Sequence, residues 1–168
     1  VFLACCLVGC QDNPGPLPLP SQRPEFPVTR AHRAGQIVSM SDDDAPSHFV
    51  RDILTGTPEW RWAGPHPALK VAVKIGTGLH FIAEFTVADA TFKSTGPVTI
   101  NFLVNGKSIG SERYSSPGMY SFDKAVEDGT LLPGKDAELS LDVDKYWTSP
   151  VDGAKLAVIL SKIGLRQQ

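Results

Sequence analysis

The stretch Val98-Thr99-Ile100-Asn101-Phe102-Leu103-Val104-Asn105-Gly106 decides the fold class of this chain. Its apolar residues recur at alternate positions, which is typical of a β-strand with one face on a core and the other in water. Asn105-Gly106 then supplies two residues that tolerate a positive φ, so the chain is expected to turn back as a hairpin. The sequence therefore predicts antiparallel β-structure around this segment.

The same alternation continues on both sides of the hairpin. Strands are predicted around residues 70–75, 79–87 and 139–144, with shorter ones over 36–40, 49–54, 60–63 and 119–126. The segment Leu156–Leu160 is apolar at every position, which places it centrally in a sheet. Gly- and Pro-rich turns separate these segments, and no long segment of helical period competes with them. This pattern predicts an all-β domain, either a β-sandwich or a barrel.

The composition is that of one globular domain with a tail. Of the 168 residues, 42% are hydrophobic and 20% are charged, which is ordinary for a soluble domain. A domain of this size buries enough surface to fold without disulfides or metals. The formal net charge is -2 and the Lys and Arg residues are scattered, so the sequence gives no electrostatic case for nucleic acid as a partner.

The N-terminal residues indicate where in the cell the protein is targeted. The apolar run Val1–Val8 is too short to span a bilayer, and it leads directly into Gly9-Cys10. A small residue before a Cys at the end of such a run is typical of a secretory signal with a cleavage site. Because no Met, Lys or Arg precedes Cys10, we expect residues 1–9 to be a truncated signal peptide. The alternative is a fragment whose first residues form a buried strand.

The four residues Leu7-Val8-Gly9-Cys10 resemble the bacterial lipobox, in which the Cys is acylated and becomes the new N-terminus. The resemblance implies a lipoprotein of the cell envelope, outside the cytoplasm, whose partner is a membrane reached through a lipid anchor on Cys10. The cysteines of the chain are Cys5, Cys6 and Cys10, so cleavage before Cys10 leaves no pair for a disulfide.

Residues 10–28, the lipidated Cys and a Pro-rich stretch, are expected to be an unstructured tether. Prolines at this spacing favour extended polyproline II structure and prevent sheet pairing. The alternative is a ligand for a proline-recognition domain. The β-sandwich domain is then expected over residues 29–168.

Beyond the tether, the motifs resemble the small jelly-roll β-sandwich domain that is appended to many bacterial glycosyltransferases. In order, they are Trp60-Arg61-Trp62-Ala63-Gly64, the hairpin at 97–106, Leu131-Leu132-Pro133, the acidic alternating strand at 139–144 and the apolar segment 156–165. The resemblance implies a jelly roll of two antiparallel sheets with a carbohydrate-associated role. The glycosyltransferase catalytic domain has no counterpart in this sequence, so no transferase activity is implied.

Five residues are candidates for binding a ligand: Trp60, Arg61, Trp62, Tyr146 and Trp147. Alternation places Trp60 and Trp62 on one face of a strand and Arg61 on the other. On a solvent face the indoles would stack on sugar rings, with Arg61 donating hydrogen bonds to hydroxyls or carboxylates. We favour the other placement, with the indoles in the core. Tyr146 and Trp147 are expected in a loop, either as ligand contacts or as a plug at the end of the core.

Motifs of enzymes and of metal or cofactor sites are missing from the sequence. It contains no His-Glu-x-x-His, no Gly-x-Ser-x-Gly and no Gly-x-x-x-x-Gly-Lys, and its histidines lack metal-binding spacing. Ser41-Asp42-Asp43-Asp44 could bind calcium but lacks the spacing of a calcium loop, so we expect a solvated turn. His66, between two prolines, is expected in an exposed loop.

The sequence thus favours a membrane-anchored cell-envelope lipoprotein whose domain is a non-catalytic binding module, with glycan as the leading ligand class. The alternative is a structural or protein-interaction lipoprotein that holds an envelope protein and has no small-molecule ligand.

Overall fold

The computed structural model describes residues 36–54 and 59–168, and these residues form a sandwich of antiparallel strands. The predicted signal peptide, the acylated Cys10 and the Pro-rich tether lie outside the described residues. Within the described ranges, no helix is long and apolar enough to cross a membrane.

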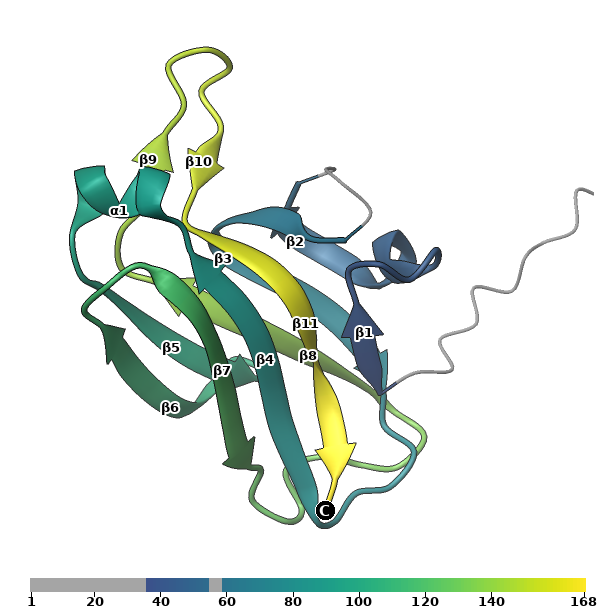
Figure 1. Cartoon of the computed structure of the whole chain (residues 1–168). Helices are drawn as coiled ribbons and strands as arrows, with labels where there is room; N and C mark the ends of the chain where they lie inside the picture. Colours follow the sequence, from purple (N-terminus) through teal and green to yellow (C-terminus); the bar gives the residue numbers. More distant parts are fainter. Residues whose placement is uncertain (1–35, 55–58) are drawn as a thin grey trace, which may run out of the picture. The chain divides into compact units, whose positions relative to one another are not determined.

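Eleven strands and two short helices follow one another in the described part of the chain (Figure 1). The strands are β1 (Ile37–Ser39), β2 (Phe49–Ile53), β3 (Arg61–Ala72), β4 (Leu79–Val87), β5 (Val98–Val104), β6 (Lys107–Tyr114), β7 (Gly118–Ala125), β8 (Asp136–Val143), β9 (Trp147–Thr148), β10 (Lys155–Leu156) and β11 (Val158–Gln167). The helices are the 3-10 turn η1 (Ala45–His48) and α1 (Asp89–Thr95).

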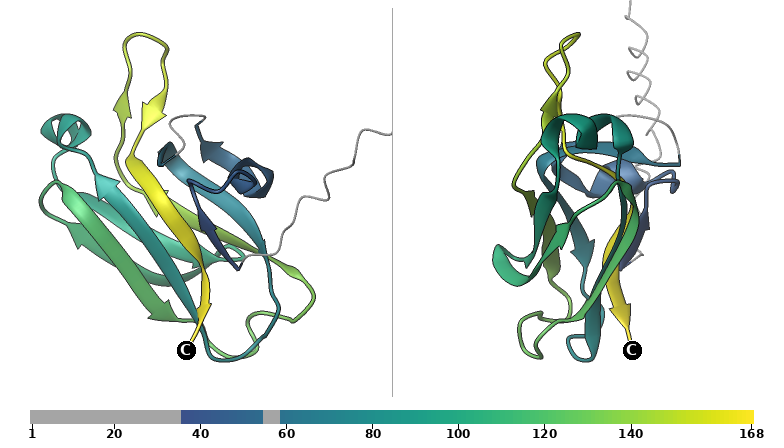
Figure 2. Two further views of the ribbon diagram at one scale, coloured as in Figure 1. Left: turned by 45° about the vertical axis from the view of Figure 1, so that its right-hand side comes forward. Right: turned by 60° about the vertical axis from the view of Figure 1, so that its left-hand side comes forward.

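A continuous hydrogen-bonded path joins the strands in the order β6-β5-β8-β3-β11-β4-β7, with β2 beside β3 and β1 beside β11. The path folds over between β3 and β11, where only the short segments Arg61–Ala63 and Val158–Leu160 pair. One layer is therefore β6-β5-β8-β3 and the other is β11-β4-β7 (Figure 2). The predicted jelly-roll sandwich is confirmed, with its two antiparallel sheets joined along one side. The central place predicted for residues 156–160 is confirmed for residues 158–160, since β11 lies between β3 and β4, whereas Leu156 belongs to β10 of a separate two-stranded sheet.

The core between the layers is filled from alternate strand positions. Burial alternates along β4 and β5 as the sequence predicts. Phe102 of β5 stacks on Phe122 of β7, with ring centroids 3.6 Å apart, and this contact joins the two layers. The predicted hairpin turn is confirmed as well, since Asn105 and Gly106 have φ values of 49° and 77°.

Strand β3 differs from the prediction. The segments expected at 60–63 and 70–75 form one strand, Arg61–Ala72, which continues through Pro65 and Pro67. Prolines donate no ladder hydrogen bond, and residues 64–67 pair with none of β2, β8 and β11. His66, expected in a loop, therefore lies in an unpaired stretch of a strand. The seven-residue helix α1 was also not predicted, because it is too short to show helical periodicity.

Candidate ligand-binding face

Trp60 and Trp62 lie on the outer face of the sandwich. Ala63 and Leu69 of the same strand face the core, so alternation turns Trp62 to the opposite side. Both indoles are partly exposed, and neither belongs to the core cluster of the described residues. The two rings meet edge to face, with centroids 6.4 Å apart. The core placement that we favoured from the sequence is therefore wrong.

Arg61 points to the inner side of the same strand. It lies opposite Leu160, a fully buried core residue of β11. Its guanidinium carbon lies 5.6 Å from the centroid of the Phe49 ring, a cation–π arrangement. The Nε atom is buried without a hydrogen-bond partner. Arg61 is thus separated from the two indoles by the sheet and does not line the same face.

The strand register extends the indole pair into a row across neighbouring strands. Trp62 lies opposite Ile159 of β11, Ile159 opposite Thr86 of β4, and Thr86 opposite Met119 of β7. Directly opposite residues share a face of the sheet and stand about 5 Å apart at Cβ. Ile159 and Thr86 are partly exposed, and Met119 is 84% exposed. Trp60, Trp62, Ile159, Thr86 and Met119 are termed the apolar row.

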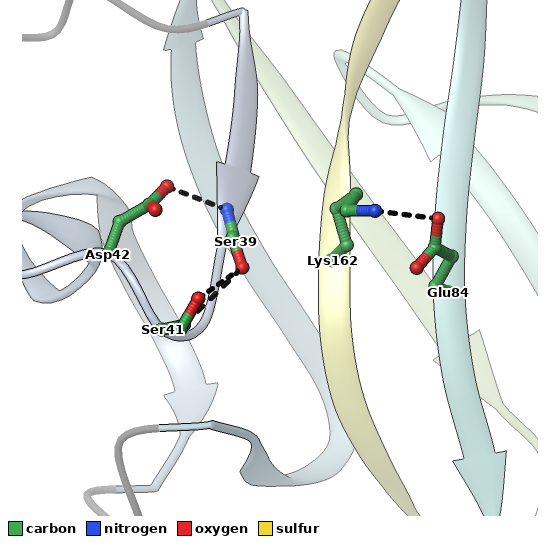
Figure 3. A network of polar contacts seen from close by, with 5 residues as sticks. All are labelled: Ser39, Ser41, Asp42, Glu84 and Lys162. Atoms are coloured by element: carbon green, nitrogen blue, oxygen red, sulfur yellow. Dashed lines mark hydrogen bonds and ion pairs between the residues drawn. The ribbon is translucent and has the colours of Figure 1, made fainter.

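A second row, of polar side chains, runs beside the apolar row. It consists of Ser39 of β1, Lys162 of β11, Glu84 of β4 and Ser121 of β7, each opposite the next in register. Lys162 Nζ donates a hydrogen bond of 2.8 Å to Glu84 Oε1 (Figure 3). This pair is partly exposed, so it orients the two side chains more than it stabilises the fold. These four residues are termed the polar row.

A β-bulge separates the two rows on β11. The register shifts between Leu160 and Lys162, which leaves Ser161 without an opposite residue on β4. A hollow of about 270 Å³ is lined by Glu84, Phe85, Met119, Tyr120, Ser121 and Ser161. The face is therefore hollowed at the end of the apolar row, where a bulge, a device that commonly re-aims side chains near binding sites, interrupts the ladder.

Tyr146 and Trp147 lie on another element. Trp147 begins β9, which pairs with β10 in a hairpin near α1 (Figure 1). The side chain of Tyr146 is 40% exposed, and Lys155 Nζ lies 5.1 Å from the centroid of its ring. Neither residue belongs to the core cluster of the described residues, so these two side chains do not close the end of the core. They stay candidate ligand contacts, on a hairpin separate from the indole pair.

A second groove, of about 430 Å³, is lined by residues of β2, β3, β5 and β8. Asp52, at a φ of 55°, accepts a hydrogen bond of 2.9 Å from the backbone N–H of His66. The Nδ1 atom of His66 lies 2.8 Å from Asp142 Oδ1. Gly64 makes room for this arrangement, because a Cβ there would stand 2.9 Å from Asp52 Cγ. Asp52, His66 and Asp142 thus bind one another, and these contacts hold the unpaired stretch of β3 in place.

The structure describes no site suited to a metal ion. Within residues 36–54 and 59–168, no three His, Cys, Asp or Glu side chains converge as a ligand set. In the acidic segment 41–44, Asp42 Oδ2 instead accepts a hydrogen bond of 3.0 Å from the backbone N–H of Ser39 (Figure 3). The segment forms the turn that the sequence predicts.

The sequence did not identify Met119, Ser121 and Lys162 as neighbours of the indoles. The outward phase of Glu84 and Thr86 was predicted from alternation and is confirmed. The neighbours of the indoles also depend on which strands lie side by side. Residue 62 pairs with residue 159, and residue 86 pairs with residue 119, so each pair joins distant segments of the chain. Alternation gives the phase of each strand separately and carries no signal for such long-range pairings.

Comparison with known proteins assigns no family to this chain. No family model matches the chain, and no curated protein matches it. Among solved structures, the carbohydrate-binding module CBM36 in complex with calcium and xylotriose is 12% identical, at a TM-score of 0.42 over 77% of this chain and 98% of that chain. The CBM36-1 domain of a multidomain xylanase from the hindgut metagenome of Trinervitermes trinervoides is 14% identical, at a TM-score of 0.38, with coverages of 76% and 94%.

An acetyl xylan esterase, Est2A, from the rumen bacterium Butyrivibrio proteoclasticus is 10% identical, at a TM-score of 0.46 over 79% of this chain. The chain spans 33% of that esterase.

Proposed function

We propose that this domain is a non-catalytic binding module that holds a glycan on the face formed by the apolar row and the polar row. The observation that carries the proposal is the edge-to-face pair of Trp60 and Trp62 on the outside of the sandwich. Indoles offer a large, rigid apolar surface, which complements the apolar C–H face of a pyranose ring. Lys162, Glu84 and Ser121 supply donors and acceptors for the hydroxyl groups beside that surface.

The face offers binding chemistry rather than hydrolytic chemistry. Glycoside hydrolysis generally uses two carboxyl groups that flank the scissile bond. Glu84 is the single carboxylate of the two rows, and Lys162 holds it in an ion pair. The arrangement therefore supports recognition without turnover.

The proposal is tested by measuring binding of the full chain to xylan, mixed-linkage β-glucan, mannan and polygalacturonate. We expect at least one polysaccharide to bind, and Trp62→Ala to weaken that binding at least about tenfold, since truncating a central aromatic anchor typically removes more than 1 kcal/mol. Leu132→Ala is the control, an exposed apolar residue outside both rows, and it should leave the affinity unchanged.

Failure of every polysaccharide to bind would overturn the proposal. So would a loss of binding in Leu132→Ala that equals the loss in Trp62→Ala. Isolation of a stoichiometric envelope-protein partner whose binding buries the two indoles would instead favour the protein-interaction alternative.

We also propose that the domain is displayed at a membrane surface of the cell envelope, through a lipid on Cys10 and the Pro-rich tether at 10–28. The support is in the sequence: the lipobox-like Leu7-Val8-Gly9-Cys10 and the proline spacing that follows it. Mass spectrometry of the protein isolated from its native membranes should find an acylated N-terminal Cys10. An unmodified thiol at that position would contradict the anchor.

A further inference from the structure

The apolar row is longer than one sugar ring needs. From Trp62 to Met119 it crosses β3, β11, β4 and β7 in turn. Neighbouring strands stand about 4.8 Å apart, so the three steps cover about 14 Å along the sheet, the first of them across the fold between β3 and β11. A single ring on the indole pair would leave the Met119 end uncovered, and Met119 is 84% exposed there. The dimensions of the row suit a chain of several linked rings.

The charges on this side of the sheet are satisfied within the protein. Lys162 is paired with Glu84 at 2.8 Å. On the next part of the same face, Asp123 Oδ1 lies 2.7 Å from His80 Nδ1, and its other oxygen accepts a hydrogen bond from Arg166. A polyanionic ligand needs cations that are not already neutralised, and a like charge such as Glu84 opposes it. The balance of charge favours an uncharged ligand.

The two rows also match the two kinds of surface on a sugar chain. Pyranose rings linked in a chain present apolar faces and hydroxyl-bearing edges. The apolar row and the polar row lie side by side on consecutive outward positions, Thr86 with Glu84 and Met119 with Ser121. The hollow beside Ser161 lies at the end of the apolar row, next to Met119. It gives a ring substituent or a final sugar unit a place below the level of the strands.

We infer that the ligand is an extended, uncharged polysaccharide that lies across β3, β11, β4 and β7, from the indole pair to the hollow beside Met119. This inference rests on the proposed glycan-binding function and specifies its ligand class and binding mode. Trp60 and Trp62 hold one end of the bound segment. Met119 contacts the other end, and Glu84 and Lys162 bind hydroxyl groups along the edge.

Calorimetry of the full chain with linear neutral oligosaccharides tests the inference. The probes are xylose, glucose and mannose oligomers of two and six units, with polygalacturonate as the polyanion. We expect the six-unit form of at least one series to bind at least about tenfold more tightly than its two-unit form, with little dependence on salt, and polygalacturonate to remain unbound. Met119→Ala should weaken the six-unit ligand severalfold and leave the two-unit ligand unchanged. Leu132→Ala, an exposed apolar residue outside both rows, is the control.

The possible failures are distinguishable. If two-unit and six-unit ligands bind equally while Trp62→Ala still removes binding, the extended mode is wrong and the glycan-binding function stands. If polygalacturonate binds more tightly than the neutral oligomers and salt weakens it, the ligand is charged and the inference is overturned. If no probe binds, both the inference and the proposed function fall.

Discussion

Two aromatic regions of this domain consist of similar side chains and lie in opposite environments. Phe102 and Phe122 stack with centroids 3.6 Å apart and are 0% and 4% exposed. Trp60 and Trp62 meet edge to face at 6.4 Å on the outside of the sheet. The phenylalanines occupy core-facing positions of their strands, and the indoles occupy the opposite phase. Strand phase, rather than residue type, therefore separates the core from the candidate binding face.

The strongest test of this contrast is Phe102→Ala. Removing a fully buried ring that joins the two layers should lower the free energy of unfolding by about 3–5 kcal/mol. Urea denaturation followed by circular dichroism measures it. Trp62→Ala, an aromatic truncation on the outer face, should reduce stability by less than half as much. Equal losses of stability in the two variants would contradict the contrast between the buried phenylalanines and the outer indoles.

A smaller loss of stability is expected from Gly164→Ala, at the edge of the same face. A Cβ at this position would lie 2.4 Å from the backbone oxygen of Gln36 and 2.4 Å from Ile37 Cα. Strand β1 would have to move away from β11, which should cost about 1–3 kcal/mol. Lys162→Ala, on the same strand and facing the same side, removes only a partly exposed ion pair and should cost about 1 kcal/mol or less. An unchanged melting temperature in Gly164→Ala would show that β1 does not pack closely here.

The stability of the fold is expected to depend on pH through the buried hydroxyl of Tyr114. Burial raises the pKa of the Tyr114 hydroxyl, and its hydrogen bond to Glu112 acts in the same direction. The unfolded chain releases this proton near pH 10, whereas the folded chain keeps it to higher pH. The stabilising contribution is therefore complete below about pH 10 and is lost as the pH rises through the folded-state pKa.

Denaturation curves recorded on both sides of about pH 10 should show this alkaline loss of stability, and Tyr114→Phe should reduce it. Tyr146→Phe, at an exposed position, is the matched control and should behave as the unaltered protein does. The same alkaline loss in Tyr114→Phe and in the unaltered chain would exclude Tyr114 as its source.

The smallest change in stability is expected from Glu84→Gln on the polar row. The ion pair with Lys162 is partly exposed, so its loss should change stability by about 1 kcal/mol or less. The amide keeps an acceptor for sugar hydroxyls, so binding of a neutral oligosaccharide should weaken only a few-fold. A complete loss of binding would show that the charge of Glu84, and not its hydrogen bonding, holds the ligand.

Much of the fold was predictable because strand alternation and turn residues are local features of the sequence. The alternation of residues 79–87 and 98–104 and the turn at Asn105-Gly106 each depend on neighbouring residues only. The placement of Trp62 was not predictable in the same way, because the prolines around His66 suggested two strands with independent phases. Because β3 is one continuous strand, its alternation runs unbroken from Leu69 to Ala63. Both of these residues therefore face the core, and Trp62 faces outward.

The site depends even more on long-range pairing. The polar row joins residues 39, 162, 84 and 121, which are brought together by antiparallel registers between distant segments. The bulge at Ser161 adds a shift of one residue that no local pattern shows. Residue chemistry could therefore suggest the indoles, but it could not assemble the face around them.

The central claim is that the indole pair is the binding surface, and the chain offers a direct readout because it has three tryptophans. Their indole N–H signals, assigned by single Trp→Phe variants, can be followed by NMR while the neutral oligosaccharides are added. We predict that the signals of Trp60 and Trp62 shift in a saturable way and that the signal of Trp147 stays in place. A shift confined to Trp147, or no shift in any of them, would contradict the account.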